Sequence, residues 1–95
     1  MLKKKNKSAW YIYIVKCADK TLYTGIAKDV PKRIEAHNKG KGAKYTASRG
    51  PVKLVYQEKT KNRSTATKRE IKIKKLTRTE KLKLIKSRSK QKKIN

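Results

Sequence analysis

Two tyrosines, an arginine and a histidine stand at spacings that suit the chemistry of phosphodiester hydrolysis. Tyr13 and Tyr23 are ten residues apart, and Arg33 and His37 follow one helical turn apart. Cutting a phosphodiester requires a group that orients or deprotonates water and a cation over the phosphorus oxygens. A phenol or an imidazole supplies the first and a guanidinium supplies the second. The pattern therefore favours a site for phosphodiester cleavage.

The charge of the chain indicates a polyanionic partner. Thirty Lys and Arg residues against six Asp and Glu residues give a net charge of +24 on 95 residues. Nucleic acid is the commonest polyanion, so we expect DNA, or RNA, as the partner. No segment approaches the roughly 20 apolar residues of a membrane span, and we expect a soluble cytoplasmic protein. The sequence does not determine the oligomeric state, and a monomer is favoured.

The length allows one domain with one modest core. We expect a disordered basic arm at 1–7, a folded domain at 8–86 and a disordered basic tail at 87–95, because runs of like charge have little to bury. The single cysteine, Cys17, excludes an internal disulfide and a Cys-based zinc site. It is interpreted as a half-buried small hydrophobe.

A β-hairpin is predicted at the start of the domain. Residues 10–16 and 21–26 are rich in β-branched and aromatic residues. Tyr13 and Tyr23 share a face of this hairpin only if the connecting loop has an odd length, since a slip of one residue reverses every side chain. A three-residue loop at 17–19 meets that condition.

The rest of the chain predicts helices around a third strand. Asp29 is a suitable N-cap for a helix that begins near Val30 and ends at 38–40. A strand is expected at 52–57, and helices at 64–76 and 81–86, the last after a start signal at 77–80. The predicted fold class is α/β in the α+β sense, a three-stranded antiparallel sheet flanked by helices.

Residues 39–50 are predicted to form a basic loop. This segment holds three of the four glycines and no aliphatic residue larger than alanine. Cations on such a loop neutralise phosphates without reading bases. The expected nucleic-acid-binding residues are one helix lysine and four residues of the loop: Lys32, Lys39, Lys41, Lys44 and Arg49.

In the order of these motifs the chain resembles the GIY-YIG endonuclease superfamily, in its small single-domain bacterial form. The first motif is Tyr-Ile-Tyr at 11–13 and the second is Tyr-Thr-Gly at 23–25. The run from Gly25 to Arg33, the following Glu-Ala-His-Asn at 35–38, and Lys-Arg-Glu at 68–70 add to the likeness. The loop Gly-Lys-Gly-Ala-Lys-Tyr-Thr at 40–46 is also similar to that of the single-domain members.

The resemblance implies the roles of five residues. Tyr13 and Tyr23 correspond to the motif tyrosines, Arg33 to the helix arginine, His37 to the residue one turn later, and Glu70 to the metal-binding carboxylate. With this set, one Mg²⁺ or Mn²⁺ ion is expected rather than two. The implied activity is metal-dependent DNA endonuclease cleavage, structure-selective or weakly sequence-specific, with a role in repair or recombination.

Several alternatives stay open on the sequence. Tyr13 and Tyr23 could be ordinary strand residues that pack against a sheet face. Arg33 could be a solvated surface charge, and His37 could have a structural role. Glu70 fits a capping box with Thr67, although its spacing from Ala66 and Ile73 places it on an inward stripe. Family members that repair DNA often carry a lysine where this chain has Ile26. The alternative functions are a non-catalytic nucleic-acid-binding module on the same fold and a small ribosome-associated or RNA-binding protein.

Overall fold

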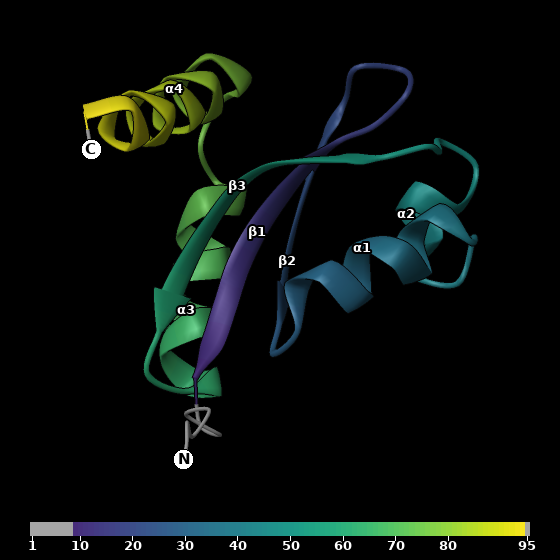
Figure 1. Cartoon of the computed structure of the whole chain (residues 1–95), viewed down its shortest axis with the longest axis horizontal. Helices are drawn as coiled ribbons and strands as arrows, with labels where there is room; N and C mark the ends of the chain where they lie inside the picture. Colours follow the sequence, from purple (N-terminus) through teal and green to yellow (C-terminus); the bar gives the residue numbers. More distant parts are fainter. Residues whose placement is uncertain (1–8, 95) are drawn as a thin grey trace.

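Three strands form one antiparallel sheet in the order β2-β1-β3 (Figure 1). They are β1 (Trp10–Lys16), β2 (Leu22–Ala27) and β3 (Lys53–Thr60). The computed structural model describes the backbone of residues 9–94 and the side chains as far as residue 87. The predicted fold class, an α+β domain whose three-stranded antiparallel sheet is flanked by helices, is confirmed. The arm predicted at residues 1–7 lies outside the described residues.

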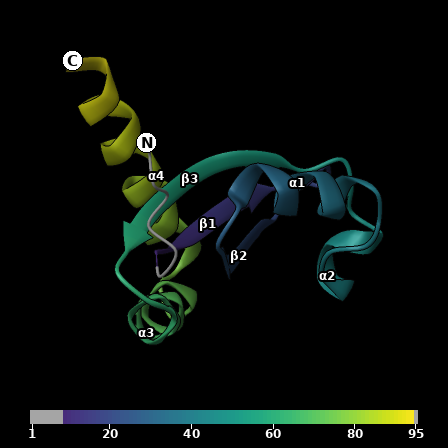
Figure 2. The same ribbon diagram turned by 60° about the horizontal axis from the view of Figure 1, so that its bottom comes forward.

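The central strand β1 is covered on both faces. Ile12 and Ile14 point to one core, shared with helices α3 (Arg63–Lys74) and α4 (Arg78–Ile94). Tyr13 and Val15 point to the other, shared with helix α1 (Val30–Asn38). Figure 2 shows α1 and α3 on the two sides of the sheet. Burial on both faces explains why β1 is continuously apolar instead of alternating with polar residues.

The hairpin register places the two motif tyrosines on one face, as predicted. Tyr13 is opposite Gly25, and Val15 is opposite Tyr23. The connecting loop has three residues but spans 18–20, because the Cys17 amide still donates to the Thr21 carbonyl at 2.8 Å. The prediction of 17–19 was therefore right in length and wrong by one position.

Helix α1 begins and ends where the sequence predicts. The Asp29 carboxylate caps it by accepting a hydrogen bond from the Lys32 amide at 3.1 Å. Val30 and His37 are buried and Ile34 is half-buried, so these three residues, at spacings of four and three, form the inward face of the helix. This face brings the only histidine of the chain against the sheet.

Two predicted boundaries are wrong around the third strand. The segment 39–50 is not all loop, because a one-turn helix α2 occupies Lys44–Ala47. The hydroxyl of Thr46 donates to the Ala43 carbonyl at 3.0 Å and supports this turn. β3 also continues to Thr60, beyond the predicted end at 57, since the Thr60 hydroxyl donates to the Trp10 carbonyl at 2.9 Å.

Helix α3 is not capped by Thr67, which the sequence left open as an alternative. Asn62 is the N-cap, and its side-chain oxygen accepts from the Thr65 amide at 2.8 Å. Thr67 therefore lies inside the helix, and a capping box between Thr67 and Glu70 does not form. The reason is that the helix begins a full turn earlier, at Arg63.

The cap of α4 is the one that the sequence predicts. The Thr77 amide donates to Glu80 Oε1 at 2.9 Å, and the Glu80 amide donates to the Thr77 hydroxyl at 3.2 Å. This reciprocal pair is a capping box. The backbone of α4 then stays helical to Ile94, which extends into the segment 87–95 for which the sequence predicts a disordered tail.

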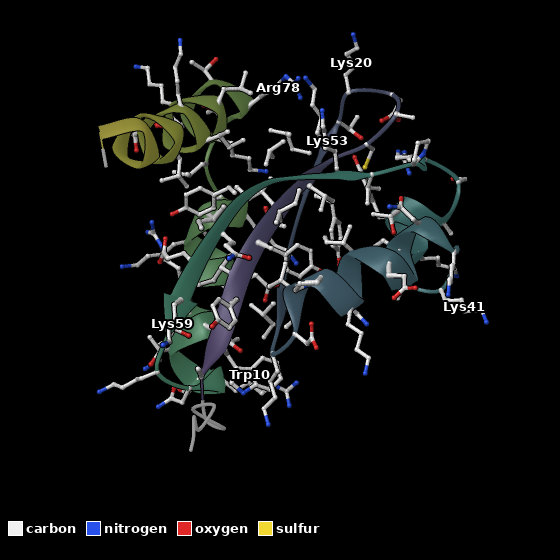
Figure 3. All side chains as sticks on the ribbon, viewed as in Figure 1. Trp10, Lys20, Lys41, Lys53, Lys59 and Arg78 are labelled. Carbon is white, nitrogen blue, oxygen red and sulfur yellow. The ribbon has the colours of Figure 1, made fainter. Side chains whose placement is uncertain are left out.

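The surface carries exposed lysines on several elements. Lys20, Lys41, Lys53 and Lys59 extend outward from the ribbon in Figure 3. Cys17, by contrast, is buried at 4% exposure and belongs to the core on the α1 side. Among the described residues, no helix combines the length and apolar character that a membrane crossing requires.

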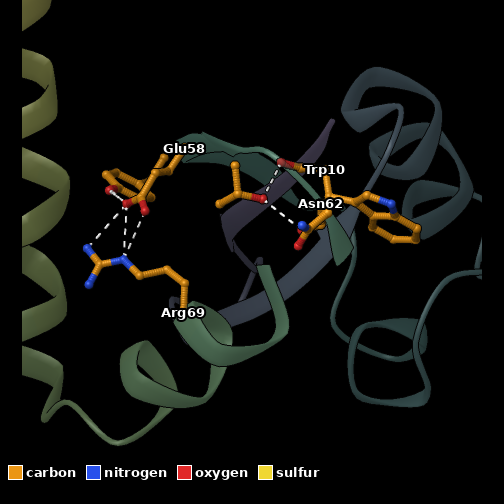
Figure 4. Close-up of polar contacts among 6 residues, drawn as sticks. Trp10, Glu58, Asn62 and Arg69 are labelled. Atoms are coloured by element: carbon orange, nitrogen blue, oxygen red, sulfur yellow. Dashed lines mark hydrogen bonds and ion pairs between the residues drawn. The ribbon is translucent and has the colours of Figure 1, made fainter. Parts of the chain in front are cut away.

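An ion pair joins α3 to β3 beside the core on the α3 side of the sheet. Arg69 Nε lies 2.9 Å from one Glu58 carboxylate oxygen and 3.2 Å from the other. The Tyr56 hydroxyl donates to the same carboxylate (Figure 4). Burial, together with the bond to Glu58, raises the pKa of Tyr56 above its ordinary value. No local spacing predicts this cluster, because Arg69 comes from a different element than Tyr56 and Glu58.

Two isoleucines of α3 test how this core is built. Ile73 is fully buried, whereas Ile71 is 48% exposed. Ile73→Ala should lower the free energy of unfolding by about 2 to 5 kcal/mol, because it deletes buried methylenes and leaves a cavity. Ile71→Ala should change it by less than about 0.5 kcal/mol. Urea denaturation of both variants checks this, and equal losses would contradict the placement of α3.

Candidate active site

The centre of the site is a row of hydrogen bonds from β1 through α1 to α2. The Tyr13 hydroxyl lies 2.8 Å from Nε2 of His37. On the other side of the ring, His37 Nδ1 lies 2.7 Å from the Thr46 hydroxyl oxygen. Tyr13 and His37 are each 1% exposed, and Thr46 is fully buried. The row therefore links three elements inside the protein, away from bulk water.

Two glycines allow the row to form. A Cβ on Gly25 would lie 2.6 Å from the Tyr13 hydroxyl oxygen, so the ring can cross β2 only over a residue without a side chain. A Cβ on Gly42 would collide with Nδ1 of His37. The glycine of the second motif is thus explained by close approach, and so is one glycine of the basic loop.

The direction of the protons along the row depends on the tautomer of His37. The Thr46 hydroxyl has one hydrogen and two neighbours, His37 Nδ1 and the Ala43 carbonyl. The Ala43 amide also donates toward Nδ1, at the longer distance of 3.4 Å, and that contact suits an unprotonated Nδ1. When the Thr46 hydroxyl donates to Ala43 and Nδ1 carries the ring proton, Nδ1 donates to Thr46 across the shorter distance of 2.7 Å. Nε2 then accepts from the Tyr13 hydroxyl. In that arrangement His37 is placed to take a proton from Tyr13.

Tyr23 and Arg33 complete the cluster around this row. The Tyr23 ring centroid lies 6.5 Å from that of Tyr13 and 5.5 Å from that of His37. Burial raises the pKa of Tyr13, and the Arg33 guanidinium beside its hydroxyl opposes that shift. Burial lowers the pKa of His37, and the charge of Arg33 lowers it further. His37 is therefore a neutral imidazole at pH 7, as a proton acceptor must be.

Glu70 lies on α3. It lies on the same stripe as Ala66 and Ile73, both fully buried, and its own side chain is 18% exposed. Its carboxylate forms an ion pair with Lys74 at 3.1 Å. The pKa of Tyr13 depends mainly on burial, on Arg33 and on Tyr23. The negative charge of Glu70 has a smaller effect, and it also raises this pKa. The predicted inward stripe is confirmed, and the carboxylate is within electrostatic reach of the Tyr13 hydroxyl.

The donors available for a metal ion are few. Within residues that the structure describes, no three His, Cys, Asp or Glu side chains gather at one point. Mg²⁺ is commonly held by one or two carboxylates together with waters and substrate phosphates. Glu70 fits that pattern for one ion, provided that the ammonium of Lys74, whose side chain is 51% exposed, moves aside.

The predicted nucleic-acid-binding residues are spread along α1 and α2. Lys32, Lys41 and Lys44 are exposed, and Lys39 is exposed but forms an ion pair with Glu35 at 3.3 Å. Arg49 is more constrained. Its Nε lies 3.0 Å from an Asp19 oxygen, and its guanidinium lies 4.0 Å from the ring of Tyr45.

The sequence interpretation missed two residues of the site. Thr46 holds the far side of His37, and Tyr45 stacks on Tyr23 with 5.7 Å between ring centroids. Both belong to the loop at 40–46, whose likeness to the family was noted from the sequence. That likeness was a signal, but nothing in the loop itself indicated which residues would turn inward.

The fold and the site together define a nuclease-type domain, and the comparisons agree. The profile of the GIY-YIG catalytic domain matches residues 9–83, so the chain belongs to the GIY-YIG family. A UPF0213 protein of Staphylococcus aureus is 60% identical over 78 residues, which cover 82% of this chain and 95% of that protein.

Two solution NMR structures have the same fold. The UPF0213 protein BH0048 of Bacillus halodurans has a TM-score of 0.54 and 41% identity, covering 82% of this chain and 83% of its own. The protein EF2693 of E. faecalis has a TM-score of 0.58 and 39% identity, covering 92% and 90%. The recognition made from the sequence motifs is confirmed.

The buried imidazole makes stability depend on pH in a defined direction. The unfolded chain binds a proton at His37 near pH 6.5, whereas the folded chain binds it only at lower pH. The free energy of unfolding should therefore fall as the pH drops from about 7.5 to about 5.5. His37→Gln should lack this slope, because the chain has one histidine and carboxylates titrate lower. Urea denaturation across this range checks it, and parallel pH curves for the two proteins would contradict it.

Proposed function

We propose that this protein is a metal-dependent DNA endonuclease, structure-selective or weakly sequence-specific, that acts in repair or recombination. Membership of the GIY-YIG family supports nuclease chemistry and a nucleic-acid substrate. The observation that carries the proposal is the buried 2.8 Å contact between the Tyr13 hydroxyl and a neutral His37, with Arg33 beside it. Any buried tyrosine hydroxyl needs a hydrogen-bond partner, but a structural one does not need a guanidinium as well, whereas a hydrolytic site needs both a proton acceptor and a cation.

The proposed proton transfer runs through Tyr13 in preference to Tyr23, because the Tyr13 hydroxyl is the one in contact with His37. A buried phenol with a raised pKa is a poor base alone, because its anion is unfavourable. Tyr13 can accept a proton from the attacking water while its own proton passes to Nε2 of His37. The water oxygen then bonds to phosphorus, and the bond to the leaving oxygen breaks. Arg33 would bind the phosphate oxygens as negative charge develops on them.

The metal is part of the proposal. Glu70 would hold one Mg²⁺ or Mn²⁺, which when bound supplies positive charge for the phosphate and the leaving 3′ oxygen. Burial of Tyr13 and His37 keeps bulk water from the hydrogen bond between them and keeps His37 neutral. Nothing in this scheme needs the lysine that Ile26 replaces, because His37 takes the proton.

A non-catalytic nucleic-acid-binding module is the second candidate. The observation that favours it is the ion pair between Glu70 and Lys74, which occupies the carboxylate with an internal partner. In that case Glu70 stabilises α3 and the basic residues hold phosphates without cutting. The two functions give opposite predictions for Glu70.

Glu70→Gln should abolish cutting while DNA binding persists, because the substitution removes the metal-binding charge and keeps the shape. Glu35→Gln is a matched control, since Glu35 forms the same i,i+4 pair with Lys39 on an exposed helix face. Each substitution should cost only about 0.2 to 0.5 kcal/mol of stability. Mg²⁺-dependent nicking of single-stranded, duplex and branched DNA is the measurement. If both variants cut as the wild type does, the metal-binding role of Glu70 is wrong. If the wild type itself does not cut any of these substrates with Mg²⁺, the binding module becomes the better interpretation.

DNA binding should depend strongly on salt and weakly on sequence. If the exposed lysines neutralise four phosphates, affinity should fall about a hundredfold between 50 and 200 mM salt. Oligonucleotides of equal length and scrambled sequence should bind within a few-fold of each other, because phosphate contacts do not read bases. Fluorescence anisotropy titrations in EDTA test both. An affinity independent of salt would rule out the electrostatic contacts.

A further inference from the structure

A groove of about 610 Å³ opens beside the first turn of α1. This volume lies in the range of small-molecule sites. Part of its lining is apolar, from Ile26, Ala27 and Ala36. Its other side chains are one indole, one carboxylate and four cations: Trp10, Asp29, Lys28, Lys32, Arg33 and Arg63. The groove therefore combines an aromatic ring with a strong excess of positive charge.

The backbone of Trp10 is anchored beside this groove. Its carbonyl accepts a hydrogen bond from the Thr60 hydroxyl at 2.9 Å, and Figure 4 shows its ring directed away from that contact. The ring is only half-buried. Two cations lie near it, with Arg63 Cζ at 5.3 Å and Lys28 Nζ at 5.8 Å from its centroid. Both cations are on exposed side chains, so they can exchange their place on the ring for another partner.

The charge of the groove is not neutralised from within. The one carboxylate there, Asp29, accepts the Lys32 amide as the helix cap. None of the ion pairs in the described part of the chain includes Lys28, Lys32, Arg33 or Arg63. An anion that enters the groove therefore does not have to displace an internal carboxylate.

The groove is continuous with the candidate active site through one residue. Arg33 lines the groove, and its guanidinium also lies beside the Tyr13 hydroxyl. A strand whose phosphate is held by Arg33 would place the adjacent nucleotide over the groove. That nucleotide offers a planar base and phosphates, which match an indole and cations. Base stacking on an aromatic ring is stronger than an exposed cation–π contact, so a base can replace a cation on the ring.

We propose that this groove binds one unstacked nucleobase of the substrate strand against Trp10, with its flanking phosphates held by Lys28 and Arg63. The inference rests on the proposed function only in taking nucleic acid as the substrate. It adds a specific requirement. A base inside an undisturbed duplex is stacked on its neighbours, so the nucleotide next to the cut must be flipped, frayed or unpaired when it binds.

The chain has one tryptophan, so the indole reports directly on its own occupancy. The full-length protein would be titrated in EDTA with a short oligothymidylate and with an abasic phosphodiester oligomer of the same length. Stacking on Trp10 should quench its fluorescence with the first oligomer and leave it nearly unchanged with the second. The abasic oligomer should also bind about tenfold more weakly. Equal quenching and equal affinity would overturn the proposal and leave a groove that holds phosphates only.

Substitutions separate the ring from the charge. Trp10→Leu should lose the preference for the oligomer with bases, whereas Trp10→Phe should keep part of it, with circular dichroism confirming that both fold. Lys28→Gln should weaken binding of both oligomers more than Lys53→Gln, which changes an exposed lysine at the far end of the sheet from Trp10 (Figure 3). A base preference that survives in Trp10→Leu would overturn the assignment to Trp10.

The binding result and the nuclease result can fail separately. Because the titrations contain EDTA, they measure the groove without cutting. Base-dependent quenching by a protein that cuts no DNA with Mg²⁺ or Mn²⁺ would support the groove and contradict the nuclease. Mg²⁺-dependent cutting without any base-dependent quenching would support the nuclease and overturn the groove.

Discussion

The structure depends on burying both faces of the central strand β1. Its alternate side chains belong to two different cores, one closed by α1 and the other by α3 and α4. Tyr13 is a member of the first core and also carries the hydroxyl at the centre of the site. Packing therefore fixes the position of the group proposed to accept a proton, and a shift of one residue in the register would move it to the other core.

Close approach of backbone and rings sets the geometry of the site. Gly25 lets the Tyr13 ring cross β2, and Gly42 lets the basic loop reach the imidazole of His37. Thr46 then contacts the far nitrogen of the same ring, so His37 is held from both sides. A residue held in this way has little freedom to rotate, which is the kind of support that catalytic groups require. The one-turn helix α2 carries Thr46 and so supplies the contact to the far nitrogen of His37.

The fold leaves most of the positive charge of the chain on the surface. The net charge of +24 opposes compaction through self-repulsion. The structure uses several carboxylates for caps and ion pairs, such as Asp29 at α1 and Glu58 against Arg69. Most of the described lysines extend into solvent. Their charge remains available for phosphates, and the concentration of cations beside Arg33 places part of it next to the proposed site of cleavage.

The sequence by itself determined the local features and the family. The period of the strands, the Asp29 cap and the spacing of Arg33 and His37 depend on near neighbours, so a sequence pattern predicts them. Only the tertiary structure decided that Asn62 rather than Thr67 begins α3, that Thr46 turns toward His37, and that Trp10 lines a basic groove. These are contacts between elements distant in the chain or choices among competing caps. Which contacts and caps form depends on how the helices pack on the sheet, and the spacing of residues along the chain does not predict that packing.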